Sequence, residues 1–113
     1  MRKEITITNI YSVNMIKKLS KIGYTYSEIL ILGFRLINKN NIQEYLEEIT
    51  IYKTSLKYKK DKKGKPFSIK VNQNIYQNLE DIKDVLKDNN IRYKEFIDFI
   101  IYKTYINILD KEL

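Results

Sequence analysis

The side chains of this 113-residue chain that could take part in chemistry are few. It has no histidine, no cysteine and three glycines, which excludes the commonest general base, a thiolate nucleophile, cysteine ligands for zinc and a glycine-rich phosphate loop. One acidic group could in principle hold a metal ion: Glu80, Asp81, Asp84 and Asp88. Because this group recurs at helical spacing opposite an apolar stripe, we interpret it as a solvated helix face. We therefore expect no catalytic residue, no metal site and no cofactor, and we do not expect an enzyme.

The lysines are the second group with functional potential. The chain has 21 basic and 14 acidic residues, a formal charge of +7, which suggests a polyanionic partner. Most of the excess lies within residues 53–65, which contain Asp61 and these lysines: Lys53, Lys57, Lys59, Lys60, Lys62, Lys63 and Lys65. A linker exposed to solvent would have the same composition. Charge alone therefore does not establish a nucleic-acid partner.

Two short segments place polar side chains at every second position. Residues 4–8 read Glu-Ile-Thr-Ile-Thr, and residues 67–71 read Phe-Ser-Ile-Lys-Val. Alternation of this kind with β-branched residues is typical of a half-buried strand. We therefore expect two strands, each with an apolar face on the core and a polar face directed away from it.

Two helices are predicted after the first strand. Asn9 can cap the first of them, whose apolar residues recur at helical spacing: Val13, Ile16, Leu19 and Ile22. Gly23 follows in the position that favours a left-handed residue. Thr25 and Glu28 then form a capping box at the start of the second helix. In that helix, Gly33 would allow a partner helix to approach closely.

The same order follows the second strand, which is preceded by a breaker at residues 64–66, Gly-Lys-Pro. Asn72 is the expected cap of the next helix, whose apolar stripe consists of Ile75, Leu79, Ile82, Val85 and Leu86. The turn at Asp88-Asn89-Asn90 suits asparagine, which tolerates the left-handed conformation. The last helix begins near Arg92 and is apolar almost all round, so we expect it to be buried against its counterpart in the first copy.

An amphipathic helix is predicted between the two copies, with these apolar residues: Ile42, Tyr45, Leu46, Ile49, Tyr52 and Leu56. Its glutamates come early and its lysines late, as the helix dipole favours. The tetrapeptide Ile-Tyr-Lys-Thr occurs at residues 51–54 and again at residues 101–104. We interpret this repetition as chance in a chain rich in these residue types. The alternative is that the middle helix is the true equivalent of the last one.

The first copy resembles a ribbon-helix-helix DNA-binding motif. The resemblance rests on the strand Ile5-Thr6-Ile7-Thr8, the helix after it, and residues 23–29, Gly-Tyr-Thr-Tyr-Ser-Glu-Ile, which are similar to the family's Gly-x-Ser/Thr-x-Ser-x-Ile/Leu pattern. The second copy resembles the motif less closely, with Lys94-Glu95-Phe96 in place of Ser27-Glu28-Ile29 and Arg92 in place of Thr25. Together the two copies cover about four-fifths of the chain. Two motifs in one chain resemble the tandem regulators of archaeal viruses and of conjugation relaxosomes.

The resemblance implies a DNA-reading surface. In this family two strands pair antiparallel and the ribbon enters the major groove, where the outward side chains meet base edges. By alternation, the implied base readers are Thr6, Thr8, Ser68, Lys70 and Asn72. The starts of the helices after the strands would bind phosphates, which implies Asn9, Tyr11, Gln73 and Asn74. We add Lys63 and Lys65, because the lysine-rich segment leads directly into the second strand. A strand face that is simply exposed to solvent would show the same alternation.

We therefore predict a mainly α protein with a short two-stranded antiparallel β-ribbon, arranged as a tandem ribbon-helix-helix unit. Residues 1–39 would form the first motif, residues 40–65 the connecting helix and lysine-rich linker, and residues 66–113 the second motif. The ribbon would form within one chain. The expected function is sequence-specific binding of double-stranded DNA in transcription regulation, by a monomeric pseudo-dimer that can form dimers or higher oligomers on DNA.

Two other functions remain open. One is a relaxosome accessory DNA-binding protein, and the other is an interaction protein in which the first motif only dimerises the chain and the C-terminal helices dock a partner protein. No segment reaches the roughly 18 consecutive apolar residues of a membrane span, and the first four residues are not those of a signal sequence. We therefore expect no membrane partner and an intracellular protein, in the cytoplasm of a prokaryotic host.

Overall fold

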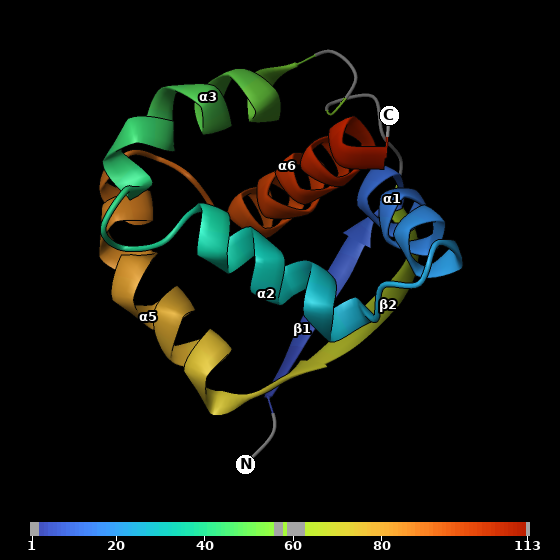
Figure 1. Ribbon diagram of the computed structural model, residues 1–113. Helices are drawn as coiled ribbons and strands as arrows, with labels where there is room; N and C mark the ends of the chain where they lie inside the picture. The colour runs from blue at the N-terminus through green and yellow to red at the C-terminus, as the bar shows by residue number, and fades with distance from the viewer. Residues whose placement is uncertain (1–2, 56–57, 59–62, 113) are drawn as a thin grey trace.

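The computed structural model describes residues 3–55, 58 and 63–112. In chain order its elements are β1 (Lys3–Asn9), α1 (Ile10–Lys21), α2 (Tyr26–Leu36), α3 (Ile42–Thr54), β2 (Lys63–Val71), α5 (Gln73–Asp88) and α6 (Tyr93–Glu112) (Figure 1). The described chain is therefore mainly helical with a two-stranded antiparallel sheet, as the sequence predicts. None of the described helices is both long and apolar enough to span a membrane.

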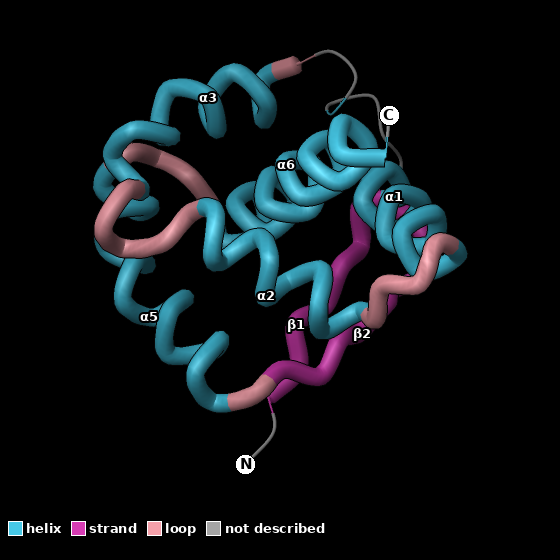
Figure 2. Tube along the Cα trace, viewed as in Figure 1, coloured by secondary structure: helices cyan, strands magenta, loops and turns pink. Residues whose placement is uncertain are grey.

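The two strands β1 and β2 form an antiparallel ribbon within one chain (Figure 2). Ile5 pairs with Ile69, and these two residues, Ile7 and Val71 are almost fully buried on the inner face of the ribbon. The polar residues between them are exposed, so the predicted alternation is confirmed. A slip of one residue in either strand would exchange the two faces, so burial of these four side chains fixes the register.

The start of β2 differs from the sequence-based expectation of a strand beginning at Phe67. β2 begins at Lys63 and includes the predicted breaker at residues 64–66. The register shifts between the pairs Ile7–Phe67 and Asn9–Lys63, so that one residue of β1 faces three residues of β2. A bulge of this kind tolerates a proline, which has no N–H to donate to a neighbouring strand. The breaker therefore interrupts the pairing without ending the strand.

The helix starts and the turns carry the predicted local signals. Asn9 and Asn72 each accept, through the side-chain oxygen, a hydrogen bond from the backbone N–H three residues later, at 3.1 and 2.9 Å. Thr25 does the same at 3.1 Å. The turn residues Gly23 and Asn90 have φ angles of 112° and 58°. These positions confirm the predicted caps and left-handed turns.

The two copies meet through equivalent positions, as they would around an approximate two-fold axis. Helices α2 and α6 come together at Gly33 and Ile100, each ten residues after the left-handed residue of its own turn. The strands meet at the pair Ile5–Ile69, and each of these residues lies two positions before the last buried residue of its strand. In Figure 1, α1 and α5 lie on opposite sides of the molecule, with α2 and α6 between them.

Helix α6 lies at the centre of the core and contacts β1, α1, α2, α3 and α5. Its Phe96, Phe99, Ile100 and Ile101 are fully buried. The second helix of each copy also packs against the strand of the other copy, α2 on β2 and α6 on β1. The prediction that the last helix is buried against its counterpart is therefore confirmed, and the close approach expected at Gly33 occurs there.

Helix α3 packs on α6 and belongs to neither β-α-α copy. The Tyr52 ring of α3 stacks on Tyr102 of α6 with centroids 4.6 Å apart, and Lys103 Nζ lies 3.0 Å from Glu48 Oε2. Tyr52 and Tyr102 are the second residues of the repeated tetrapeptide, and the alternative that α3 is the equivalent of α6 stays a prediction. Leu56, which the sequence places on the apolar stripe of α3, lies outside the described residues.

Candidate nucleic-acid interface

The outer side of the ribbon presents the polar side chains that alternate with the buried ones. Thr6 stands opposite Ser68, with the two hydroxyl oxygens 3.4 Å apart, and Glu4 stands opposite Lys70. These four side chains are exposed, and Thr8 beside the bulge is half-buried. We call these five residues the ribbon face. Helices α2 and α6 pack on the two strands, and the exposure of these side chains shows that this side of the ribbon is open within the described chain.

Two asparagines of the predicted site have a structural task at the helix starts. Asn72 lies one residue beyond β2, and its Oδ1 is occupied by the cap of α5; Asn9 Oδ1 is occupied in the same way at α1. Bidentate recognition of adenine by asparagine needs both the oxygen and the amide group. The cap uses one of the two lone pairs of Asn72 Oδ1, and the base contact of Asn72 stays a prediction.

The two predicted phosphate-binding helix starts are not equivalent. Gln73 and Asn74 are exposed in the first turn of α5, where the dipole of a 16-residue helix favours an anion. Tyr11, in the first turn of α1, is half-buried and lines a cavity between α1, α3 and α6. The structure therefore places Gln73 and Asn74 at an open helix end and Tyr11 against a cavity.

The start of α2 lies beside β2, a neighbour that the sequence-based interpretation missed. Ser27 Oγ donates a hydrogen bond to the backbone oxygen of Lys70 at 3.0 Å, and the Tyr26 ring meets Phe67 edge-on at 4.9 Å. A hollow of about 280 Å³ between the starts of α2 and α5 is lined by Ser27, Ile31, Lys70, Val71, Asn72 and Ile75. The capping box at Thr25 signals this helix start but not its neighbour, because capping is local and the contact to β2 is not.

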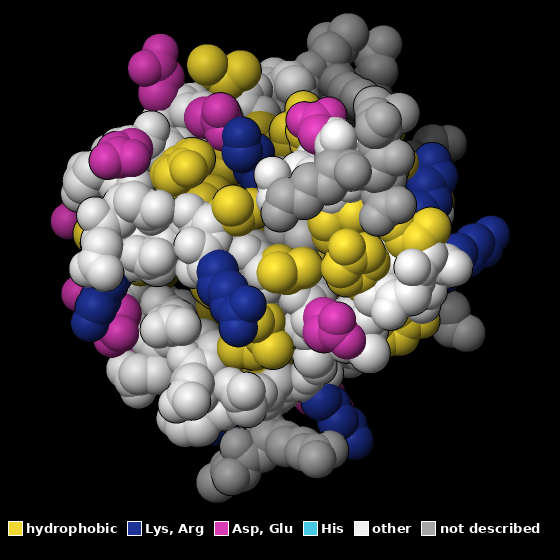
Figure 3. All heavy atoms as spheres, viewed as in Figure 1, with side chains coloured by type: hydrophobic (Ala, Val, Ile, Leu, Met, Phe, Trp, Pro, Cys, Tyr) yellow, Lys and Arg dark blue, Asp and Glu magenta, His cyan; other side chains and the backbone are white. Residues whose placement is uncertain are grey.

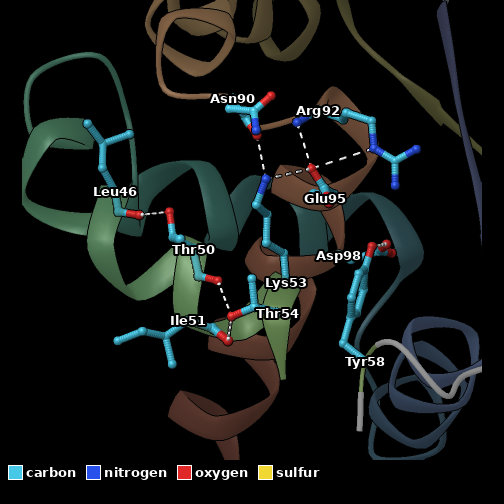
Figure 4. A network of polar contacts seen from close by, with 10 residues as sticks. All are labelled: Leu46, Thr50, Ile51, Lys53, Thr54, Tyr58, Asn90, Arg92, Glu95 and Asp98. Atoms are coloured by element: carbon cyan, nitrogen blue, oxygen red, sulfur yellow. Dashed lines mark hydrogen bonds and ion pairs between the residues drawn. The ribbon is translucent and has the colours of Figure 1, made fainter. Parts of the chain in front are cut away.

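The lysines of residues 53–65 do not form one functional group. Lys53 belongs to α3, and its ammonium donates a hydrogen bond to the backbone oxygen of Asn90 and lies 3.6 Å from Glu95 Oε1 (Figure 4). Lys63 and Lys65 belong to β2, but their side chains lie outside the described part of the chain, as do Lys57, Lys59, Lys60 and Lys62 altogether. Lys53 therefore acts within the protein, and the phosphate contact proposed for Lys63 and Lys65 stays a prediction.

Glu95 joins three segments near the start of α6 (Figure 4). Its Oε1 accepts the backbone N–H of Arg92 at 2.8 Å and lies 3.6 Å from Arg92 Nε. The side chains of Glu95 and Lys53 are 9% and 15% exposed, so the ion pair between them is shielded from water. A partly buried carboxylate of this kind needs its partners, because an unpaired charge in the interior is costly.

Removing the ammonium of Lys53 is expected to destabilise the protein. Lys53→Met should lower the free energy of unfolding by about 1–3 kcal/mol, because the shielded carboxylate of Glu95 loses a charged donor. The matched control is Lys103→Met, whose pair with Glu48 is more exposed, and a loss of about 0–1 kcal/mol is expected. Urea unfolding followed by circular dichroism measures both, and equal losses would contradict a special role for Lys53.

A second buried carboxylate, Asp98, holds α6 against α1. Ser12 Oγ donates to Asp98 Oδ1 at 2.6 Å and the Tyr58 hydroxyl donates to Oδ2 at 2.8 Å. Burial raises the pKa of Tyr58, and the charge of Asp98 and this hydrogen bond raise it further. The pKa of Tyr93 is raised to about 12, first by burial and then by the nearby Tyr76. Both phenols therefore stay protonated at neutral pH, and the Tyr58 hydroxyl serves as a hydrogen-bond donor to Asp98.

The acidic group on α5 lies on an exposed face of the helix. Its four members are exposed: Glu80, Asp81, Asp84 and Asp88. Within residues 3–55, 58 and 63–112, no three side chains of the metal-binding acidic type come together closely enough to hold an ion. The interpretation of this group as a solvated helix face agrees with its exposure.

A large cavity lies away from the ribbon face, between α1, α3 and α6. It has a volume of about 850 Å³, and its rim includes the exposed Ile10, Ile51 and Ile106. Figure 3 shows hydrophobic side chains on the helical side of the molecule, over α2 and toward α1. Aromatic rings of Tyr52 and Phe99 form part of its wall. This cavity favours an interaction other than nucleic-acid binding.

No protein-family model, curated protein or solved structure matches the chain. The ribbon face and the helix starts beside it are therefore the features from which we infer a function. The ribbon face and these helix starts form an open polar surface.

Proposed function

We propose that the protein is a sequence-specific double-stranded DNA-binding regulator of the tandem ribbon-helix-helix type. The observation that carries the proposal is the intrachain ribbon, whose outer face holds Thr6, Ser68 and Lys70 while crossed helices cover its inner face. A two-stranded ribbon fits the width of the major groove, and these side chains can donate to or accept from base edges. The two copies would act as a pseudo-dimer, which needs no second chain to complete the ribbon.

The surroundings of the ribbon face support a nucleic-acid partner. The start of α5, with Gln73 and Asn74, and the start of α2, with Ser27, flank β2 near Lys70. Helix starts present backbone N–H groups and the positive end of a dipole, both of which suit a phosphate. The lysine-rich segment before β2 would add a contact that does not depend on sequence. A regulator of transcription and a relaxosome accessory protein would share this surface.

The interaction protein remains a second candidate, on the observation of the 850 Å³ cavity between α1, α3 and α6. In that hypothesis the first copy would serve to dimerise the chain. β1 is already paired with β2 of the same chain, which favours the DNA-binding hypothesis. DNA binding at low salt distinguishes the two candidates.

Truncating Lys70 tests the proposed function. Lys70→Ala should weaken binding to a duplex selected from random DNA by roughly 1–3 kcal/mol and leave the fold intact, because this side chain is exposed. Thr6→Ala should act in the same direction. Fluorescence anisotropy titrations on the selected duplex and on a random duplex, at several salt concentrations, measure the losses.

The matched control is Lys39→Ala, since Lys39 is an exposed lysine in the loop between α2 and α3. Lys39→Ala should leave the affinity for the selected duplex and the affinity for the random duplex almost unchanged. Equal losses on both duplexes for Lys70→Ala would mean that Lys70 contacts only phosphates. Absence of any binding by the unmodified protein at low salt would contradict the proposal as a whole.

A further inference from the structure

The ribbon face is chemically different on the two sides of the approximate two-fold axis. The axis passes near the pair Ile5–Ile69. On one side Thr6 stands opposite Ser68, so this cross-strand pair presents two hydroxyl groups. On the other side Glu4 stands opposite Lys70, so this pair presents one carboxylate and one ammonium. The strands therefore place a neutral pair and a charged pair at related positions of the same surface.

The carboxylate of Glu4 needs a donor if this surface faces DNA. A negative charge directed at a polyanion is unfavourable unless it accepts a hydrogen bond. In the major groove the donors are the amino groups of cytosine and adenine, and carboxylates pair with cytosine N4. Lysine pairs with the N7 and O6 acceptors of guanine. Glu4 and Lys70 together thus complement the two halves of a single G·C base pair.

The spacing of the ribbon agrees with base-pair readout on both sides of the axis. Side chains directly opposite on an antiparallel pair have Cβ atoms about 4.5–5.5 Å apart. Cross-strand pairs two residues apart along a strand are separated by roughly 6.8 Å, about two base steps of 3.4 Å. An A·T pair fits the charged pair less well, because adenine N7 is an acceptor beside its amino group and thymine carries a methyl group. The same methyl group suits Thr6, whose side chain has both a methyl and a hydroxyl.

We propose that the charged pair of Glu4 and Lys70 reads a G·C base pair, while the hydroxyl pair of Thr6 and Ser68 reads an A·T base pair about two steps away. The inference rests on the proposed DNA-binding function and adds an orientation of the protein on its DNA site. The protein would recognise an asymmetric site, and a single chain would bind it in one orientation. Glu4 is therefore a specificity-determining residue, a role that its negative charge conceals in the sequence.

Glu4→Gln tests this assignment, because glutamine can pair with adenine N6 and N7 where a carboxylate prefers cytosine. The probe is a duplex selected from random DNA by the unmodified protein, together with versions that carry each other base pair at every position of the site. For the unmodified protein, replacing the G·C pair at one position should raise the Kd about 5- to 150-fold. In Glu4→Gln the penalty for A·T at that same position should shrink at least several-fold, with the other positions unchanged.

The matched control is Glu28→Gln, which removes the same charge from the exposed first turn of α2. It should change the Kd of all duplexes by one common factor. If Glu4→Gln also acts by one common factor, Glu4 only repels DNA and the assignment is overturned, while the DNA-binding function stands. A selected site without a G·C pair about two steps from an A·T pair overturns it too. Failure of the unmodified protein to bind any duplex at low salt overturns the DNA-binding function itself, and the assignment with it.

Discussion

Ile69→Asp is expected to abolish folding of the chain. Ile69 is 2% exposed and pairs with Ile5 at the centre of the ribbon, where α2 and α6 cover the inner face. An aspartate there would place an unpaired charge among apolar side chains, at a cost above about 4 kcal/mol. Small domains have about 5–15 kcal/mol of total stability, so this loss is comparable to the whole stability of a domain at the lower end of that range. Ile7→Asp should behave in the same way, because Ile7 is equally buried.

The matched controls are Ser68→Asp and Thr6→Asp, one residue away on the same strands. Both side chains lie on the ribbon face and are exposed, so an aspartate should cost less than about 1 kcal/mol. Circular dichroism spectra and thermal unfolding distinguish the two sets of variants. If the Ser68 variant unfolded while the Ile69 variant stayed folded, the strand would be out of register by one residue.

The sequence predicts the element order and the local boundaries because their signals lie within a few residues of one another. Asn9, Thr25 and Asn72 cap helices through hydrogen bonds to N–H groups three residues later. Gly23 and Asn90 adopt left-handed turns that their residue types tolerate. Each of these signals is complete in a short segment, so no knowledge of the rest of the chain is needed to interpret it.

The features that the sequence does not predict depend on contacts between distant segments. Lys53 looks like one member of a lysine run, and only the approach of α3 to the turn before α6 makes it a partner of Glu95. Asp98 looks like one acid on an apolar helix until Ser12, 86 residues away, donates to it. Amphipathicity shows that α3 has an apolar side, but not that this side packs on α6.

The candidate site is predictable only in part, because some of its features are local and others depend on contacts between distant segments. Alternation alone identifies Thr6, Ser68 and Lys70 as outward side chains, since a strand has a period of two. The pairing of Glu4 with Lys70 is invisible in the sequence, because cross-strand register depends on which residues of two distant segments are buried together. The proximity of Ser27 to Lys70 depends in the same way on how α2 lies across β2.

Gly33→Ile is the substitution expected to disturb the helix crossing most. A Cβ at this position would lie 1.8 Å from Ile100 Cγ2 and 3.1 Å from Thr104 Oγ1, both on α6. The two helices would have to separate, and overpacking of a core costs about 1–3 kcal/mol or more. The control Arg35→Ile introduces the same β-branched side chain at an exposed position of α2 and should cost less than about 1 kcal/mol. Urea unfolding of both variants gives the comparison.

Exchanging Gly33 and Ile100 tests whether these two residues share one space where α2 crosses α6. Ile100→Gly alone should cost about 3–6 kcal/mol, because it leaves a cavity and adds a glycine to a helix interior. If Gly33 and Ile100 hold equivalent positions on the axis, the double variant Gly33→Ile, Ile100→Gly restores one large and one small residue at the crossing. The double variant should then lose less stability than the sum of the two single losses, with a coupling free energy of about 1–3 kcal/mol. Additive losses in the double variant would show that the two positions do not share a space, which would contradict the packing of α2 on α6 at Gly33.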